Sequence, residues 1–442
     1  MPGELTPRRS ARSIFIFWVP LAATWLMMAL EGPFLAAVIA RLADPKFNLA
    51  AYGVAFAFAL LVEAPVIMIM SASTALVEDA GSYRKLRNYT YALNAGITAL
   101  MLVVIVPPIF YFLAETLIGL PENVARLTHV ALLFLIPWPA AIGYRRFFQG
   151  LLIRAGLTRL VAYGTVVRLS SMALTALALY VTVKPAGAYL GAIALSAGVC
   201  GEALAARLMA VGTVRRLLAT TADIARTEKP LDYRGITVFY VPLALTSILG
   251  LAVQPMVTFF MGRAPHPVES LAVLPVVISL SFVFRAMGLS YQEVAIALMG
   301  KRFEHARELG RFALILGLAS SLGLALIGFT PLARFWFETV SGLTRELAAF
   351  AVPPTRILAI LPGLSVLLSY QRAILVQGRF TGPITTSTAI EVVGILVVLL
   401  ALTQGWAMVG ATAAAIGFIV GRLGGNIYLV RPCLHTIGRS KV

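Results

Sequence analysis

Several carboxylates and arginines lie inside long apolar stretches of the chain, where ionisable side chains are unusual. The carboxylates are Glu31, Glu63, Glu202, Glu293 and Glu391, and the arginines are Arg168, Arg207, Arg285 and Arg422. A charge at the depth of a lipid bilayer costs about 2.5–3.5 kcal/mol on insertion scales, so such a residue normally faces a partner or a water-filled cavity. Ion pairing, ion coupling and the binding of a charged solute are the chemistry that this set can support.

The chain contains an internal repeat. Residues 19–24 (Val-Pro-Leu-Ala-Ala-Thr) recur as residues 241–246 (Val-Pro-Leu-Ala-Leu-Thr), an offset of 222 positions. Each copy also carries several long apolar stretches. A duplicated unit of this kind predicts two similar membrane bundles with a substrate path between them.

The repeat places opposite charges at equivalent positions. The offset of 222 aligns Glu63 with Arg285, and an offset of 223 aligns Arg168 with Glu391. Two accounts remain open at this point. These residues form ion pairs across the two lobes that lock one conformation, or they are ligands for a charged substrate.

Glu31 lies in the middle of an apolar stretch, in the sequence Leu-Glu-Gly-Pro. Glycine and proline loosen a membrane helix and free backbone carbonyl groups. A carboxylate there suits a proton-coupling or gating group, although a structural hydrogen bond into the opened helix fits as well. The equivalent residue of the second half is Val253, so this feature is unique to the first half.

The remaining candidates carry weaker signals. Arg207 and Arg422 lie near the cytoplasmic ends of two predicted membrane spans, 187–213 and 405–430. A long arginine side chain can reach the membrane surface from such a position, which accounts for these two residues without any function. Tyr52 is a candidate for a cavity wall, while Tyr144-Arg145-Arg146 and Tyr370-Gln371-Arg372 are read mainly as topology signals. We therefore expect substrate-binding or gating roles for Glu31, Glu63, Arg168, Arg285, Glu391 and Tyr52, and secondarily for Glu202, Arg207, Glu293, Arg372 and Arg422.

The composition predicts an integral membrane protein. Hydrophobic residues make up 60% of the chain and charged residues only 12%, whereas soluble domains carry about 25% charged residues. Twelve apolar stretches approach or exceed the roughly 20 residues that cross a bilayer. They are 14–40, 48–76, 88–114, 124–148, 158–183, 187–213, 235–261, 269–299, 307–330, 346–370, 383–403 and 405–430.

Lysine and arginine predict the topology. Most of them fall in the loops on the side of the N-terminus, so both termini are expected to be cytoplasmic. Six spans in each half make the two repeats parallel. The expected domains are lobes at 1–214 and 235–442, with a cytoplasmic connector at 215–234. This topology also accounts for the net charge of +17, so nucleic-acid binding is not expected.

The sequence lacks the motifs of the common enzyme classes. It has no His-Glu-x-x-His pair, no phosphate-binding loop and no Gly-x-Ser-x-Gly elbow, and its four histidines are scattered. We expect neither catalytic residues nor a metal site. Because no ATP-binding motif is present, any uphill transport must draw on a gradient, with H⁺ or Na⁺ as a candidate coupling ion.

Two parallel six-span repeats that each open with Val-Pro-Leu-Ala resemble the multidrug/oligosaccharidyl-lipid/polysaccharide exporter superfamily, which has the MATE-like fold. Within it, Val19-Pro20-Leu21, Glu31 and residues 51–56 (Ala-Tyr-Gly-Val-Ala-Phe) are similar to the first two spans of the progressive-ankylosis (ANK) transporters. That resemblance implies the export of small organic anions such as citrate, nucleotides or pyrophosphate. Multidrug extruders of the superfamily carry cation-handling carboxylates in the first lobe, a role that Glu31 and Glu63 also fit.

These observations predict an all-α membrane protein that exports a small organic anion by alternating access between two lobes. A proton- or sodium-coupled multidrug cation antiporter is the first alternative, and a flippase for a lipid-linked saccharide is the second. The expected setting is the bacterial inner membrane, with lipid and a small-molecule substrate as partners and a monomeric protein. The intramembrane arginines favour the anion over the cation.

Overall fold

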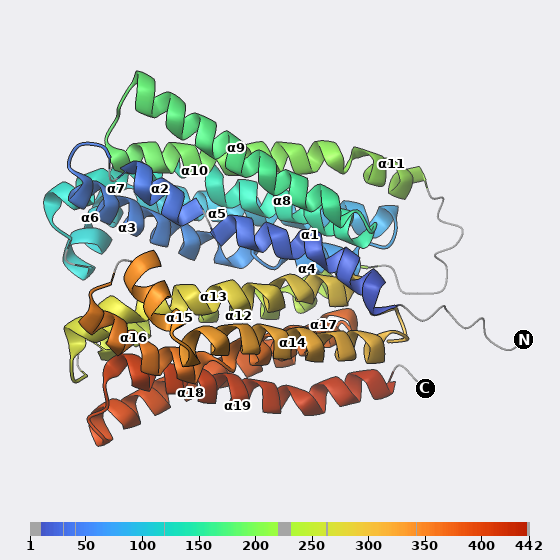
Figure 1. The fold of residues 1–442 in the computed structure, drawn as a ribbon. Coiled ribbons are helices and arrows are strands. Elements are labelled where there is room, and N and C mark those ends of the chain that lie inside the picture. Colours follow the sequence, from blue (N-terminus) through green and yellow to red (C-terminus); the bar gives the residue numbers. More distant parts are fainter. Residues whose placement is uncertain are drawn as a thin grey trace, which may run out of the picture. The chain divides into compact units, whose positions relative to one another are not determined.

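The computed structural model describes residues 10–439 except 30, 40, 119, 220–230, 262, 263 and 342, and all of its regular elements are helices. The chain forms two compact units (Figure 1). The first unit is Ala23–Tyr240, and the second is Val241–Val442 together with Met1–Ala22. The predicted connector 215–234 lies mostly outside the described residues, and the predicted lobes 1–214 and 235–442 remain a prediction.

The described residues contain eleven helices that are long and apolar enough to cross a membrane. A twelfth span is formed if the bent pair α7 (Glu122–Phe134) and α8 (Pro137–Arg154) counts as one. The prediction of an all-helical, polytopic membrane protein is therefore confirmed. The parallel arrangement of the repeats and the sidedness of the termini stay predictions.

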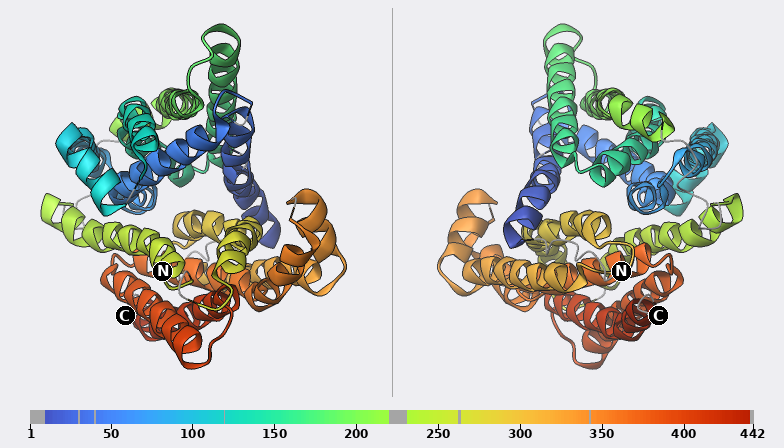
Figure 2. Two further views of the ribbon diagram at one scale, coloured as in Figure 1. Left: turned by 90° about the vertical axis from the view of Figure 1, so that its left-hand side faces the viewer. Right: turned by 90° about the vertical axis from the view of Figure 1, so that its right-hand side faces the viewer.

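The first unit begins within α1 (Ala11–Ala29) and ends within α12 (Tyr233–Met261). The axes of its long helices are roughly aligned, so many of them are foreshortened in the end views (Figure 2). Between α1 and α12 lie α2 (Glu31–Ile39), α3 (Pro45–Glu63), α4 (Ile69–Leu76), α5 (Ala80–Ile105), α6 (Pro107–Tyr111), α7, α8, α9 (Thr158–Thr182), α10 (Gly187–Met209) and α11 (Val211–Ala219).

The second unit continues from α12 and also includes the start of α1. Trp18 of α1 donates its Nε1 hydrogen to Ser290 Oγ at 2.8 Å, which ties this end of the chain to α13. The other helices are α13 (Pro267–Leu298), α14 (Ala306–Phe329), α15 (Leu332–Arg334), α16 (Arg345–Leu358), α17 (Leu361–Gln377), α18 (Gly382–Leu400) and α19 (Gly410–Arg439).

Prolines break three of the membrane spans. Pro65 sits in a 3₁₀ turn between α3 and α4, Pro137 opens α8 after a bend of 40°, and Pro362 follows the break before α17. Proline lacks a backbone N–H and disfavours the helical conformation of the residue before it. In a membrane such breaks persist only where other groups satisfy the freed carbonyls.

The helix α5 begins earlier than the apolar stretch that predicted it. The hydropathy pattern places the start of the span near residue 88, but α5 begins at Ala80. Asp79 Oδ1 accepts a hydrogen bond from the Ser82 backbone N–H at 2.7 Å, and Ser82 Oγ accepts one from the Asp79 backbone N–H at 3.0 Å. This capping box satisfies the orphan amides of the first turn, so a polar turn extends the helix.

A glycine brings two helices close together in each unit. A methyl group at Gly198 of α10 would lie 2.9 Å from the Arg168 carbonyl oxygen of α9. A methyl group at Gly421 of α19 would lie 2.5 Å from the Glu391 carbonyl oxygen of α18. Both contacts need glycine because the two backbones touch there.

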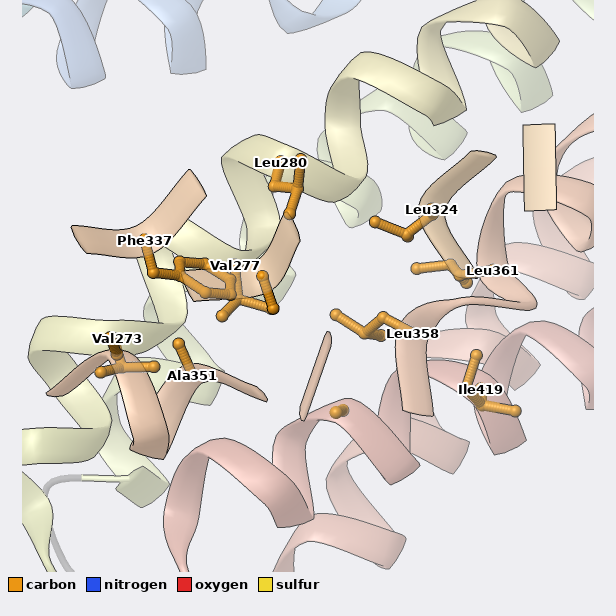
Figure 3. Close-up of a cluster of buried hydrophobic side chains, with 12 residues drawn as sticks. Val273, Val277, Leu280, Leu324, Phe337, Ala351, Leu358, Leu361 and Ile419 are labelled. Carbon is orange, nitrogen blue, oxygen red and sulfur yellow. The ribbon is translucent and has the colours of Figure 1, made fainter. Parts of the chain in front are cut away.

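The second unit has a core of interdigitating aliphatic side chains. Val273, Val277 and Leu280 of α13 point into it, and Phe337 and Leu358 close it from the other side (Figure 3). Because lipid is as apolar as these side chains, close packing rather than the hydrophobic effect holds such helices together. This packed core fixes the course of α13, the helix that also carries Arg285.

Candidate functional site

Arg168 lies between two carboxylates in the first unit. Its Nη2 donates to Glu31 Oε2 at 2.6 Å, and its Nη1 lies 3.6 Å from Glu202 Oε2. Arg168 is on α9, Glu31 begins α2 and Glu202 is on α10, so three separate helices meet here. All three side chains are buried. The arginine therefore links the start of α2 to the body of the unit.

Glu202 is the most enclosed member of this group, with none of its surface exposed. It accepts hydrogen bonds from Arg145 Nη1 at 2.5 Å and from Gln149 Nε2 at 2.9 Å. Arg145 and Gln149 are four residues apart on α8 and so share one face of the helix. Because several donors surround it, the negative charge of the buried Glu202 carboxylate is well compensated.

Glu63 ends α3 and is buried, but its Oε2 is enclosed without a hydrogen-bond partner among the described residues. The charges of Arg146, Arg145 and Arg168 act on it electrostatically. We call Glu31, Glu63, Glu202, Arg145, Arg146 and Arg168 the first network. Its three carboxylates balance its three guanidinium groups.

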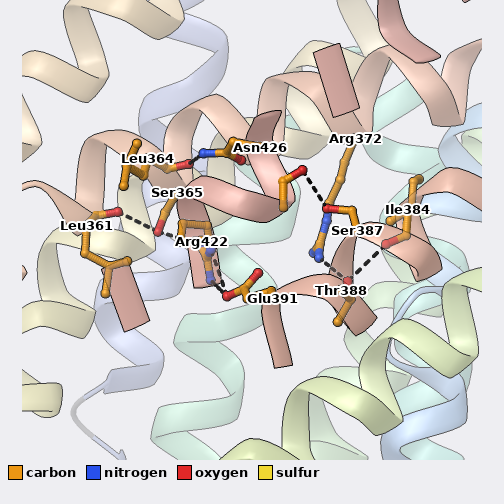
Figure 4. A network of polar contacts seen from close by, with 11 residues as sticks. Leu361, Leu364, Ser365, Arg372, Ile384, Ser387, Thr388, Glu391, Arg422 and Asn426 are labelled. Atoms are coloured by element: carbon orange, nitrogen blue, oxygen red, sulfur yellow. Dashed lines mark hydrogen bonds and ion pairs between the residues drawn. The ribbon is translucent and has the colours of Figure 1, made fainter. Parts of the chain in front are cut away.

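The second unit contains a different network, centred on Glu391 of α18 (Figure 4). Glu391 Oε1 accepts hydrogen bonds from Arg422 Nη2 at 2.6 Å and from Arg422 Nε at 2.8 Å. Arg422 Nη1 donates to Ser365 Oγ at 2.8 Å. This fork of hydrogen bonds joins α17, α18 and α19.

Two more arginines lie within electrostatic reach of Glu391. Arg372 of α17 donates from Nη2 to Thr388 Oγ1 at 2.9 Å, whereas Arg285 of α13 makes no hydrogen bond with the described residues through its guanidinium group. The Nε atoms of Arg285 and Arg372 are enclosed and have no partner there. We call Glu391, Arg285, Arg372 and Arg422 the second network. It has three guanidinium groups for one carboxylate.

The other predicted residues lie outside these two networks or at their edge. Tyr52 of α3 stacks on Phe56 with ring centroids 6.2 Å apart, and the charges of Glu31 and Arg168 reach it. Glu293 is buried further along α13 and is not among the groups that act on Glu391. Arg207 lies over the ring of Phe148 at 5.1 Å. A cation–π contact, rather than the first network, thus holds Arg207.

Arg145 and Arg146 are the residues that the sequence analysis placed wrongly. They were read mainly as topology signals near the end of the span 124–148, but α8 continues to Arg154 and both side chains are buried. Arg372, which was read in the same way, lies within α17. Counting charges ignores the direction in which a side chain points. The spacing of Arg145 and Gln149, four apart on one helical face, was the signal available in the sequence.

No group of three or more metal-ligating side chains occurs among residues 10–439 as far as the structure describes them. Ion pairs between helices are what this arrangement offers: they can form, break and exchange partners when a charged ligand or a proton arrives.

Comparison with known proteins identifies the fold. A MATE transporter from Vibrio cholerae, VcmN in the bent form, is 17% identical with a TM-score of 0.75, and 97% of each chain is covered. A MOP superfamily transporter from Pyrococcus furiosus, described as having a binding pocket of reverse polarity, is 14% identical with a TM-score of 0.77, over 98% of this chain and 97% of that one. A eukaryotic MATE transporter is 15% identical with a TM-score of 0.73, over 97% of each chain.

These matches show that the chain has the MATE fold over nearly its whole length. No model of a protein family matches the sequence, and no curated protein does.

Proposed function

We propose that this protein is a secondary transporter that exports a small organic anion by alternating access between its two units. The observation that carries this proposal is the second network, in which three arginines surround one carboxylate. Uncompensated charge at membrane depth is costly, so two excess positive charges call for a negatively charged partner. A substrate with two negative charges would neutralise the network.

The fold supports transport as the activity. The structural relatives over nearly the whole chain are MATE transporters of the MOP superfamily. One of them is described as having a binding pocket of reverse polarity that suggests a different function, so the polarity of the pocket varies among proteins of this fold. The resemblance to ANK-type transporters makes citrate, pyrophosphate and nucleotides the first substrates to examine.

The remaining features of the proposal concern topology and coupling. We place both termini in the cytoplasm, with two parallel repeats of six helices, and the protein as a monomer in the bacterial inner membrane. In this reading the balanced first network is the gate. Glu31 and Glu63 would exchange H⁺, or bind Na⁺, as the units alternate. The second network would hold the substrate.

A multidrug cation antiporter is the second candidate. The enclosed and unpartnered Oε2 of Glu63 favours it, because a buried carboxylate attracts an organic cation or a proton. One structural relative is a multidrug resistance MATE family transporter. The two candidates differ in which network meets the substrate, so one experiment separates them.

The experiment measures uptake into proteoliposomes of labelled citrate, pyrophosphate and ATP beside an organic cation dye, with and without imposed H⁺ and Na⁺ gradients. We expect anion uptake, and a loss of about a hundredfold in Arg285→Ala, since removing a buried charge from a charged contact costs about 2–5 kcal/mol. Arg311→Ala is the matched control, because Arg311 is an exposed arginine of α14.

Two outcomes contradict the proposal. Dye uptake that is driven by a gradient and lost in Glu31→Gln would make the protein a cation antiporter. Movement of neither class would reject both small-molecule candidates. It would also favour the flippase for a lipid-linked saccharide, which the same vesicles can test with a fluorescent lipid.

A further inference from the structure

A groove opens between α2 and α9 of the first unit, away from the two charge networks. It has a volume of about 310 Å³ and is lined by Phe34, Val38, Arg41, Ala173, Ala176, Leu177 and Tyr180. That volume is at the lower end of the range for small-molecule sites. Apart from Arg41 and the Tyr180 hydroxyl, the lining side chains are entirely apolar.

Small residues on α9 create the depth of the groove. Ala173, Ala176, Leu177 and Tyr180 are spaced three or four residues apart, so they share one face of α9 and line the groove together. Phe34 and Val38 line it from α2. Outside the groove, the neighbouring Leu174 of α9 points away and is 66% exposed.

The position of the groove indicates what fills it. α9 is long and apolar enough to span the membrane, and α2 continues the apolar stretch of the first predicted span. An open apolar groove on such helices faces hydrocarbon rather than water. Apolar contact alone cannot favour one lipid over another there, because all lipid tails are as apolar as the residues that line the groove. A specific occupant therefore needs a polar contact at one end of the groove.

Arg41 supplies that contact. It follows the end of α2 at Ile39, and one of its guanidinium nitrogens, Nη1, donates to the Ala37 carbonyl oxygen. Its other nitrogens make no hydrogen bond with the described residues, and the side chain is exposed. A guanidinium group presents a fork of donors that matches a phosphate, and Tyr180, which also lines the groove, has the chemistry of membrane-interface anchors.

We propose that this groove binds a phospholipid with an anionic headgroup, with one acyl chain between α2 and α9 and the phosphate at Arg41. The same two helices bring Glu31 and Arg168 together. The bound lipid thus braces the helix pair that carries the first ion pair, and the lipid composition of the membrane regulates its opening. This inference depends on the fold and on the membrane setting, and it holds for an anion or a cation substrate alike.

The test uses the full-length protein in nanodiscs that contain phosphatidylglycerol or phosphatidylcholine with a photoactivatable group on one acyl chain. Cross-linked residues are mapped by mass spectrometry. We expect adducts at Phe34, Leu177 and Tyr180, with about fivefold more from phosphatidylglycerol, the effect of one basic residue near an anionic lipid. Arg41→Gln is expected to abolish this preference without disturbing the fold, since Arg41 is exposed.

Two neighbouring substitutions provide the matched comparison. Ala173→Phe fills the groove and is expected to remove the adducts, whereas Leu174→Phe changes the adjacent, outward-facing position and is expected to retain them. Equal labelling by the two lipids would overturn the proposal, and so would adducts at Leu174 as frequent as those in the groove. Neither result bears on anion uptake, so this test can fail while the proposed function stands.

Discussion

The two units build charge networks of opposite character on similar helical scaffolds. The first network balances three carboxylates against three arginines, and most of its groups are paired. The second network gives three arginines a single carboxylate, and the Arg285 guanidinium group donates no hydrogen bond to the described residues. A balanced network stabilises its unit, whereas an unbalanced one is complete only with a ligand. The comparison therefore separates a network of paired charges from one with an excess of positive charge.

Removing one arginine from each network tests this separation most strongly. Arg168→Ala is expected to lower the free energy of unfolding by about 3–5 kcal/mol, because it leaves buried carboxylates uncompensated. Arg285→Ala is expected to change that free energy by less than about 1 kcal/mol, because it removes no hydrogen bond. Unfolding in sodium dodecyl sulfate, followed by circular dichroism, measures both. Equal losses would mean that the second network is as structural as the first.

Within the first network, a paired carboxylate and one whose Oε2 has no partner among the described residues are expected to differ in the same way, with smaller changes in stability. Glu31→Gln removes a charge-assisted hydrogen bond to Arg168 and is expected to cost about 1.5–3 kcal/mol of stability. Glu63→Gln alters a carboxylate whose Oε2 has no partner and is expected to cost less than about 1 kcal/mol. The same unfolding assay compares them. A larger loss of stability in Glu63→Gln than in Glu31→Gln would show that Glu63, at the end of α3, is the carboxylate that stabilises the unit.

The backbone contacts beneath the two networks are expected to behave alike. Gly198→Ala and Gly421→Ala each insert a methyl group against a carbonyl oxygen of the facing helix, so each is expected to cost about 1–3 kcal/mol. Gly53→Ala is the control, because nothing lies within 4 Å of a methyl group there. Unfolding of the three variants under identical conditions checks this. A cost at only one of the two sites would show that the scaffolds differ as well as the charges.

The smallest expected effect concerns Glu391. Its carboxylate accepts a hydrogen bond from Arg422 and therefore competes with an anionic substrate for that arginine. Glu391→Gln is thus expected to raise the affinity for labelled pyrophosphate by about tenfold. Glu63→Gln in the other unit is expected to leave this affinity unchanged. Equilibrium binding to the purified protein measures both. Weaker binding in Glu391→Gln would show that the carboxylate orients the arginines instead of competing with the substrate.

Much of the fold could be predicted from the sequence because long apolar stretches have few alternatives in a membrane. The positions of Glu31, Arg168, Glu202 and Glu391 within such stretches also drew attention to four of the ionisable residues that lie in the two networks, but not to Arg145 or Arg146. The pairing could not be predicted, since Glu31 meets Arg168 at a distance of 137 residues along the chain. The role of Arg145 was missed because its basic charge was read as a topology signal, whereas burial depends on which face of α8 a residue occupies.

The glycine contacts also separate what spaces the helices from what pairs their charges. Gly198 lies against the backbone oxygen of Arg168, and Gly421 lies against that of Glu391. Every residue type carries this backbone oxygen, so the close approach of each helix pair depends on the glycine and not on the charge that faces it. A substitution at Arg168 or Glu391 therefore changes the pairing of charges, whereas a substitution at Gly198 or Gly421 changes the spacing of the helices themselves.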